Sequence, residues 1–190
     1  INVMRRLIQS SGAEVIHLGH DQSAKAVVDC AIQEDAHGVA LTSYQGGHVE
    51  YFTYIRQLLD EAGCKHIRIF GGGGGTITPP EIKTLHESGI SKIYSPDDGR
   101  AMGLMGMIHH LMGLASEVDL VNSERLATLN SPITAEEMAR VGLLLTLSES
   151  ADEATFKSTL ETCRSSEKEV PVIGFTGTGG AGKSSLLDEL

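Results

Sequence analysis

Short apolar runs alternate with longer amphipathic stretches over the first 115 residues. The amphipathic stretches have helical spacing and predict helices at residues 2–11, 23–36, 49–62, 80–88 and 100–115. The apolar runs predict strands at residues 14–18, 38–42, 66–70 and 92–94. Because these runs are rich in Val, Ile and Leu and lie between helices, they are typical of parallel strands buried on both faces. We therefore predict an α/β fold built on a doubly wound parallel sheet.

Glycines separate the predicted helices from the predicted strands at a regular interval. Gly12, Gly38, Gly63 and Gly89 lie about 26 residues apart, the length of one βα unit. Each is expected to end a helix, since glycine adopts the left-handed conformation of a C-cap without strain. A doubly wound fold usually opens on a strand, whereas this chain opens on a helix. We therefore expect a first strand and its loop to lie upstream of Ile1.

Five consecutive glycines, Gly71–Gly75, follow the third predicted strand. The next helix is expected to start at Thr78, with prolines in its first turn and Glu81 completing a capping box. A turn without Cβ atoms lets the backbone approach a flat or bulky ligand. Open α/β sheets bind ligands at the carboxyl ends of their strands, where this junction lies. The pattern favours ligand contact over a plain flexible loop.

The loops after the other strands, at residues 19–21, 43–48 and 95–98, would line the same edge of the sheet. Ser43 could donate to a ring nitrogen in the crevice, and a turn or N-cap serine is an equal alternative. Gly46 and Gly47 would keep a path to the crevice open.

Histidines in and near these loops raise the question of a metal. No cysteine or carboxylate cluster accompanies His20 or His48, so loop histidines in solvent are favoured over metal ligands. His109 and His110 lie on a methionine-rich predicted helix, which we interpret as core packing rather than a cofactor face.

The pattern changes after Ala115. Residues 117–130 are polar and mixed, and two further capping boxes, at 134–137 and 150–153, predict two helices. A strand at residues 170–176 then opens a new domain. We predict three regions: an α/β domain at 1–116, a helical linker at 117–169 and the start of a P-loop NTPase domain at 170–190.

A phosphate-binding motif occupies residues 177–184, which match the P-loop pattern between a predicted strand and a predicted helix. Backbone amides of such a loop cradle phosphates, Lys183 would neutralise them, and the Ser184 hydroxyl would bind Mg²⁺. The same glycines also spell G-x-G-x-x-G, but the Lys-Ser pair favours a nucleoside triphosphate over a dinucleotide.

Composition narrows the function classes. The net charge of −10, without a basic run, argues against nucleic acid and anionic membrane surfaces. No apolar stretch approaches the ~20 residues that span a bilayer, and no signal peptide is recognisable. The cysteines Cys30, Cys64 and Cys163 lack metal-type spacing, so free thiols in a reducing cytoplasm are expected.

Four segments, at residues 15–20, 43–52, 70–75 and 93–99, together with the P-loop, resemble one known family. They are similar to the flavodoxin-like cobalamin-binding domain of the methylmalonyl-CoA mutase superfamily, in those members that are fused to a GTPase chaperone domain. In such members the cobalamin domain, a linker, the GTPase domain and a substrate barrel follow in this order. The resemblance covers essentially the whole chain, and it implies that the first strand of the domain is missing here.

The resemblance implies specific contacts. Ser43 would hydrogen-bond the displaced dimethylbenzimidazole, whereas Gln45 stands where many relatives have leucine. The other implied cofactor contacts are Gly46 beside Ser43, Gly71, Gly72 and Gly73 on the nucleotide tail, and Tyr94 and Ser95 closing over it. The implied GTP contacts are Gly180, Ala181, Gly182, Lys183, Ser184 and Ser185, with Mg²⁺ on Ser184.

One family motif is missing. The D-x-H-x-x-G motif, whose histidine ligates cobalt, does not occur in the chain, and residues 35–38 begin like it but lack its final glycine. In the family the motif precedes the first helix, so we expect it upstream of Ile1. His20 is not expected to replace it.

The implied activity is that of an adenosylcobalamin-dependent mutase that converts an acyl-CoA such as isobutyryl-CoA to butyryl-CoA. GTP with Mg²⁺ would be a second ligand, the acyl-CoA would bind a barrel downstream of this chain, and the intact protein would be a homodimer. This chain alone is expected to be inactive. An alternative is a cobalamin carrier or sensor joined to a P-loop switch. A receiver domain fused to an ATPase is disfavoured, because Asp21 has no companion carboxylate.

Overall fold

The computed structural model describes residues 2–164, 174–178 and 183–188. Three strands lie within this part of the chain: β1 (Gly38–Thr42), β2 (Arg68–Gly72) and β3 (Lys92–Tyr94). The helices are α1 (Asn2–Ser10), α2 (Ala24–Gln33), α3 (His48–Glu61), α4 (Pro79–Glu87), α5 (Pro96–Ser116), α6 (Ser123–Leu126), α7 (Met138–Ser150), α8 (Glu153–Cys163) and α9 (Lys183–Asp188).

The strands form a parallel sheet in the order β1-β2-β3. Gly38 pairs with Arg68, and Phe70 pairs with Lys92, so every strand ends at the same edge. Helices connect the strands, as a parallel sheet requires. The predicted α/β fold with a flavodoxin-like parallel sheet is confirmed.

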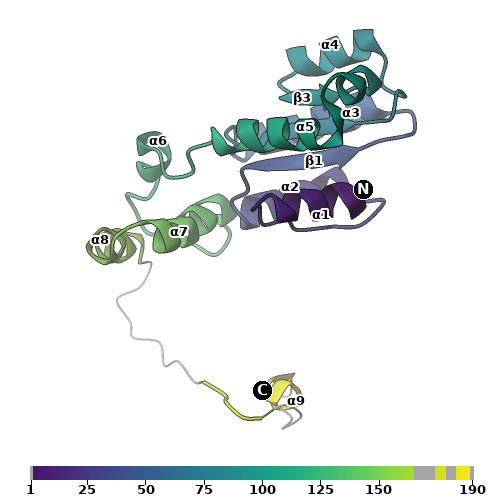
Figure 1. The fold of residues 1–190 in the computed structure, drawn as a ribbon. Helices are drawn as coiled ribbons and strands as arrows, with labels where there is room; N and C mark the ends of the chain where they lie inside the picture. Colours follow the sequence, from purple (N-terminus) through teal and green to yellow (C-terminus); the bar gives the residue numbers. More distant parts are fainter. Residues whose placement is uncertain (1, 165–173, 179–182, 189–190) are drawn as a thin grey trace.

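Helices cover both faces of the sheet (Figure 1). Phe52, Ile55 and Leu59 of α3 are fully buried and form one core with α2, α4 and the strands. Ile93 faces this core, whereas the next residue, Tyr94, contacts α5 on the opposite face. Alternation along β3 therefore places the core on one face and α5, with α1 packed against it, on the other.

The strand predicted at residues 14–18 is absent, and this prediction was wrong for the described chain. Ile16 is 47% exposed and Leu18 is 38% exposed. The outer edge of β1 has no partner strand among the described residues, and residues 14–18 do not reach it. Without a neighbour to accept its backbone hydrogen bonds, an apolar segment gains nothing from strand geometry.

The glycine caps were predicted correctly at three of four positions. Gly12, Gly63 and Gly89 have positive φ angles of 98°, 74° and 92°. Gly38 instead begins β1, where an added Cβ would lie 2.8 Å from the Phe70 ring. The left-handed turn after α2 is made by Asp35, with φ 44°, although Asp lacks the steric freedom of glycine.

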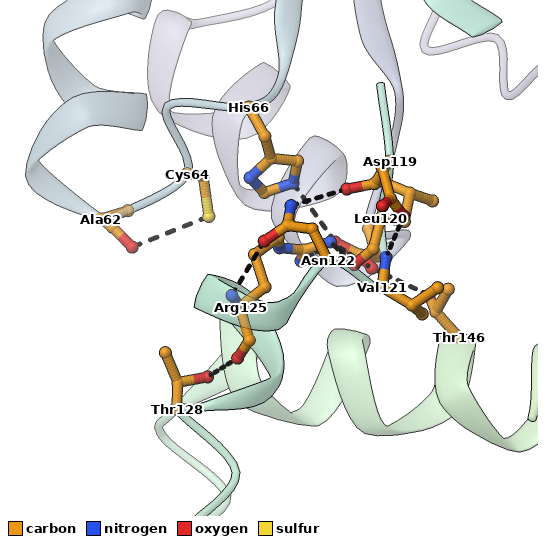
Figure 2. Close-up of polar contacts among 11 residues, drawn as sticks. Ala62, Cys64, His66, Asp119, Leu120, Val121, Asn122, Arg125, Thr128 and Thr146 are labelled. Carbon is orange, nitrogen blue, oxygen red and sulfur yellow. Dashed lines mark hydrogen bonds and ion pairs between the residues drawn. The ribbon is translucent and has the colours of Figure 1, made fainter. Parts of the chain in front are cut away.

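Asp35 also joins the sheet domain to the helices that follow it. Its buried carboxylate pairs with the Arg125 guanidinium of α6 and accepts a 2.8 Å hydrogen bond from the Thr146 hydroxyl of α7. The His66 ring, just before β2, lies 3.4 Å away. Figure 2 shows His66, Arg125 and Thr146 gathered at this junction. Burial would raise the pKa of Asp35, but hydrogen bonds from His66, Arg125 and Thr146 lower it.

The helices α6 to α8 have a small core of their own, built on Leu129, Leu143, Leu147 and Cys163. The two predicted linker helices are thus present as α7 and α8. Asp152, not Ser150, caps α8 by accepting hydrogen bonds from the amides of Ala154 and Thr155. Ser150 belongs to the last turn of α7, so the third predicted capping box was wrong.

Candidate functional site

Three loops meet at the carboxyl edge of the sheet. The Ser43 amide donates to the Gly72 carbonyl at 3.0 Å, which holds the loop after β1 against the end of β2. A Cβ at Gly73 would lie 2.5 Å from the Ser43 carbonyl, and one at Gly75 would lie 3.4 Å from Pro96. Three of the four segments that were expected to line one edge, at residues 43–48, 71–75 and 95–98, therefore lie side by side.

The five glycines that end β2 and begin the loop after it are glycine for different physical reasons. A Cβ at Gly71 would collide with Ile93 at 2.5 Å, and one at Gly73 would collide with the Ser43 carbonyl. Gly74 and Gly75 have φ angles of 56° and 96°, which side chains rarely adopt. In each of these four positions the protein's own packing or backbone requires glycine.

Gly72 is the exception. Its φ lies outside the left-handed range, and the nearest atom to an added Cβ is the Tyr94 carbonyl at 3.7 Å, an ordinary contact. Nothing in the fold requires glycine here, yet Gly72 is the last residue of β2, at the edge of the sheet where the loops meet. The missing side chain leaves open backbone that fits the approach of a flat group such as a nucleotide tail.

The first loop contains a buried histidine. His48, at the start of α3, is 5% exposed, so the expectation of a solvent histidine was wrong. Its Nδ1 lies 3.1 Å from the Gln45 carbonyl, and its Nε2 lies 3.2 Å from a Glu81 carboxylate oxygen. The hydrogen bond with the Gln45 carbonyl raises the pKa of His48. Burial lowers it, but the Glu81 carboxylate raises it further, so the pKa lies above its usual value. Glu81 lies 33 positions further along the chain, beyond local patterns.

Ser43, Gln45 and Gly46 lie in the same loop. The Ser43 hydroxyl donates to the Gln45 carbonyl at 3.3 Å, so it makes a turn contact. The Gln45 side chain is exposed, and a Cβ at Gly46 would meet no atom within 4 Å. Gly46 is exposed and leaves open space in this loop, and its contact with the cofactor stays a prediction.

Tyr94 is anchored to the opposite face of the sheet. Its hydroxyl lies 2.9 Å from His110 Nδ1 on α5, and the two rings meet edge to face. Burial, with a contribution from the Asp98 charge, raises the pKa of Tyr94 to about 12. Sequence reasoning assigned the His110 helix to core packing, but Met102 and Met105 of the same helix are 38% and 44% exposed.

Ser95 fixes the third loop by capping α5. Its hydroxyl donates to Asp98 at 2.8 Å, and the Asp98 carboxylate also accepts from the Ser95 amide at 2.8 Å. Burial opposes ionisation of Asp98, but the Ser95 amide and the Lys92 ammonium outweigh it and lower its pKa to about 2. The Ser95 hydroxyl is thus committed to the helix start, and the backbone of this loop is held rigidly beside Gly75.

The predicted P-loop is described only at its ends. Gly180, Ala181 and Gly182 lie outside the described residues, as does most of the strand predicted at 170–176; residues 174–176 are in no strand. Helix α9 begins at Lys183, so Lys183, Ser184 and Ser185 form its first turn. The expected helix start is therefore confirmed, and the phosphate contacts stay a prediction.

Among the described residues, no group of three or more His, Cys, Asp or Glu side chains could hold a metal ion. His20 is exposed, in keeping with the solvent histidine that the sequence suggested. In the same part of the chain, no helix has the length and apolar character that crossing a bilayer demands.

A parallel sheet with a glycine loop and two further loops at its carboxyl edge defines a cofactor-binding domain of the flavodoxin-like class. The family described as B12 binding domain matches residues 1–94. Fused isobutyryl-CoA mutases of Geobacillus kaustophilus (strain HTA426) and Cupriavidus metallidurans (strain CH34) are each 49% identical to this chain and cover all of it. The chain spans 18% and 17% of their lengths.

A smaller relative matches about half of the chain. The 2-hydroxyisobutanoyl-CoA mutase small subunit of Aquincola tertiaricarbonis is 32% identical over 98 residues, which cover 51% of this chain and 70% of that protein. The chain belongs to the B12-binding domain family of acyl-CoA mutases in the methylmalonyl-CoA mutase superfamily, so the resemblance seen in the sequence is confirmed.

Proposed function

We propose that residues 1–116 dock the nucleotide tail of adenosylcobalamin in an acyl-CoA mutase. The observation that carries the proposal is Gly72, the one member of the glycine run whose missing side chain the fold itself does not require. The fold class supports the same edge, since open α/β sheets bind ligands where their strands end. The relatives are named as acyl-CoA mutases, which agrees with this cofactor.

The residues at this edge would each contact a different part of the nucleotide tail. Gly72 and Gly73 would present bare backbone to the tail, and the Ser43 hydroxyl would turn from Gln45 to donate to its ring nitrogen. Tyr94, held by His110, and Ser95, held by Asp98, would lie on the opposite side of the nucleotide tail from Ser43. When bound, the cofactor supplies a homolytically cleavable cobalt–carbon bond for a carbon-skeleton rearrangement.

The named activity of the fused relatives gives the substrate class. We propose that the intact protein interconverts isobutyryl-CoA and butyryl-CoA and forms a homodimer. The acyl-CoA would bind a domain outside this chain, because the chain spans only 18% and 17% of the lengths of these relatives.

Replacing Gly72 tests cofactor docking. In the full-length protein, Gly72→Val should abolish cobalamin binding, because a branched side chain would fill the space above the strand. His20→Ala is the matched control, since His20 is an exposed residue of a neighbouring loop and its loss should leave binding intact. Binding is read from the visible spectrum of the corrinoid. Unchanged binding in Gly72→Val, with loss in His20→Ala, would refute the assignment.

We further propose that the P-loop binds GTP with Mg²⁺ and that this region gates cofactor loading. The motif supplies Lys183 for the terminal phosphates and Ser184 for the metal at a helix start. Lys183→Ala in the full-length protein should abolish GTP hydrolysis, whereas Lys157→Ala, which changes an exposed lysine of α8, should not. Undiminished phosphate release by Lys183→Ala would remove the GTPase assignment.

A further inference from the structure

One carbonyl in the first loop accepts two hydrogen bonds. The Gln45 carbonyl lies 3.3 Å from the Ser43 hydroxyl and 3.1 Å from His48 Nδ1. Ser43 and His48 therefore share one acceptor. If Ser43 turns toward a ligand, an N–H at His48 Nδ1 can keep this carbonyl paired.

The other ring nitrogen of His48 reaches a different element. Its Nε2 lies 3.2 Å from Oε1 of Glu81, and the second Glu81 oxygen accepts from both the Thr78 amide and the Thr78 hydroxyl at 2.7 Å. Glu81 caps α4, the helix that follows the glycine loop. His48 therefore reaches both elements: Nδ1 is hydrogen-bonded to the loop after β1, and the buried Nε2, which has no hydrogen-bond partner among the described residues, lies at ion-pair distance from Glu81 in the element after β2.

The protonation state decides whether both links exist. A neutral imidazole carries one N–H and can donate to only one of its two oxygen neighbours, Gln45 or Glu81. The imidazolium donates to both. In the neutral ring that faces Glu81 with its N–H, Nδ1 presents a lone pair to the Gln45 carbonyl, and that carbonyl then retains Ser43 as its donor.

We propose that His48 is the positioning residue of the cofactor edge: its cation holds the Gln45 carbonyl and the Glu81 carboxylate together, and so releases the Ser43 hydroxyl to the ligand. This inference rests on the proposed function, because it assumes that Ser43 donates to the cofactor tail. It adds a pH dependence to docking that neither Ser43 nor the glycines supply.

The sign of this dependence follows from the charges around His48. Glu81 of α4 and Glu50 of α3 are the carboxylates that face it, and together with the Gln45 carbonyl they raise its pKa above 6.5. The cation is therefore present below that raised pKa and is lost as the pH rises through it. Docking of the tail should weaken over the same interval.

Two amide substitutions separate the two links. His48→Asn places its amide nitrogen near the Nδ1 position and keeps the contact with the Gln45 carbonyl. His48→Gln places its amide group near the Nε2 position, so it keeps the contact with Glu81 and loses the contact with Gln45. In the full-length protein, adenosylcobalamin affinity of the parent should fall about tenfold as the pH rises, the equivalent of one hydrogen bond. His48→Asn should bind with no such pH dependence, and His48→Gln should bind about tenfold more weakly at every pH.

Two controls make the result specific. Glu81→Gln removes the facing charge while it keeps an acceptor for Thr78, so it should shift the midpoint of the pH profile to lower pH. Cobinamide, which lacks the nucleotide tail, should bind with the same affinity at each pH in the parent and in His48→Asn. A pH profile that survives in His48→Asn, or equal losses in His48→Asn and His48→Gln, would overturn the proposal.

A measurement without cofactor separates this inference from the proposed function. In ¹⁵N NMR spectra of the chain, the Ser43 and Gly46 amides should titrate with His48 in the parent, because the Ser43 hydroxyl donates to the shared Gln45 carbonyl and the Gly46 amide belongs to the same peptide group as that carbonyl. They should not titrate in His48→Asn. If the parent fails to bind cobalamin while the amides titrate as stated, the proposed function fails and the link itself stands. If the amides do not follow His48, the inference fails whatever the cofactor does.

Discussion

At the scale of single residues, Gly71 and Gly72 are neighbours in β2 with opposite constraints. The Cβ position of Gly71 points into the core, 2.5 Å from Ile93 and 2.7 Å from Phe52, both of which are almost completely buried. The Cβ position of Gly72 points the other way, toward the less crowded side of the strand. One glycine therefore serves packing, and the other leaves room at the proposed cofactor edge.

This difference predicts opposite effects of the same substitution. Gly71→Ala should lower the free energy of unfolding by about 1–3 kcal/mol, because the Phe52 ring and Ile93 have no free space into which to move. Gly72→Ala should leave it unchanged or raise it by up to about 1 kcal/mol, since alanine is less costly than glycine within a strand. Urea unfolding of the two variants measures both values. Equal destabilisation by both would contradict the assignment of the two sides.

At the scale of elements, the contact between the sheet domain and the linker helices depends on one buried ion pair. Asp35 is 5% exposed, and a second Arg125 nitrogen reaches its other oxygen at 3.3 Å. Gly142 of α7 packs against the end of α2, where an added Cβ would lie 2.9 Å from the Ile32 carbonyl. Close backbone contact and a paired charge thus act at the same junction.

Removing one partner of this ion pair should lower the free energy of unfolding more than removing both. Arg125→Met leaves a buried carboxylate without its cation and should cost about 3–5 kcal/mol. Asp35→Asn with Arg125→Met should recover much of this loss, because Asn tolerates the left-handed backbone at position 35. Urea unfolding gives the coupling energy, and hydrogen exchange should show faster exchange in α7 than in β2. Strictly additive single effects would mean that the ion pair does not join the two parts.

The elements also show which features a sequence reveals. The limits of β1 and β3 were predicted correctly, and the Thr78–Glu81 capping box forms, because these features depend on neighbours within a few residues. Asp35 and His48 were missed. Arg125, the partner of Asp35, is 90 positions away, and Glu81, the partner of His48, lies on a different helix. No local sequence pattern could therefore predict either contact. The edge where the loops meet was predictable, because parallel strands bring their ends together.

At the scale of the whole molecule, the outer edge of β1 has no partner strand in the part of the chain that the structure describes. In the flavodoxin-like order 2-1-3-4-5, three adjacent strands in chain order correspond to the last three of the sheet. By that correspondence, residues 14–18 are the second strand, whose only neighbour is the first, which lies between it and β1. The exposure of Ile16 and Leu18 follows from the absence of that neighbour among the described residues.

A form of the protein extended at its amino end should therefore complete the sheet. We expect the added residues to form a strand that pairs with β1 on one side and with residues 14–18 on the other. The outer edge of β1 can accept a parallel strand, and the apolar residues 14–18 would then be buried in the sheet. Amide exchange at Val15, Ile16 and the outer edge of β1 should slow markedly in the extended form, while amides between β2 and β3 serve as an internal reference. If exchange at Ile16 stays as fast as in the present chain, residues 14–18 are a loop, and the doubly wound order assigned to this domain would have to be replaced by a smaller three-stranded fold.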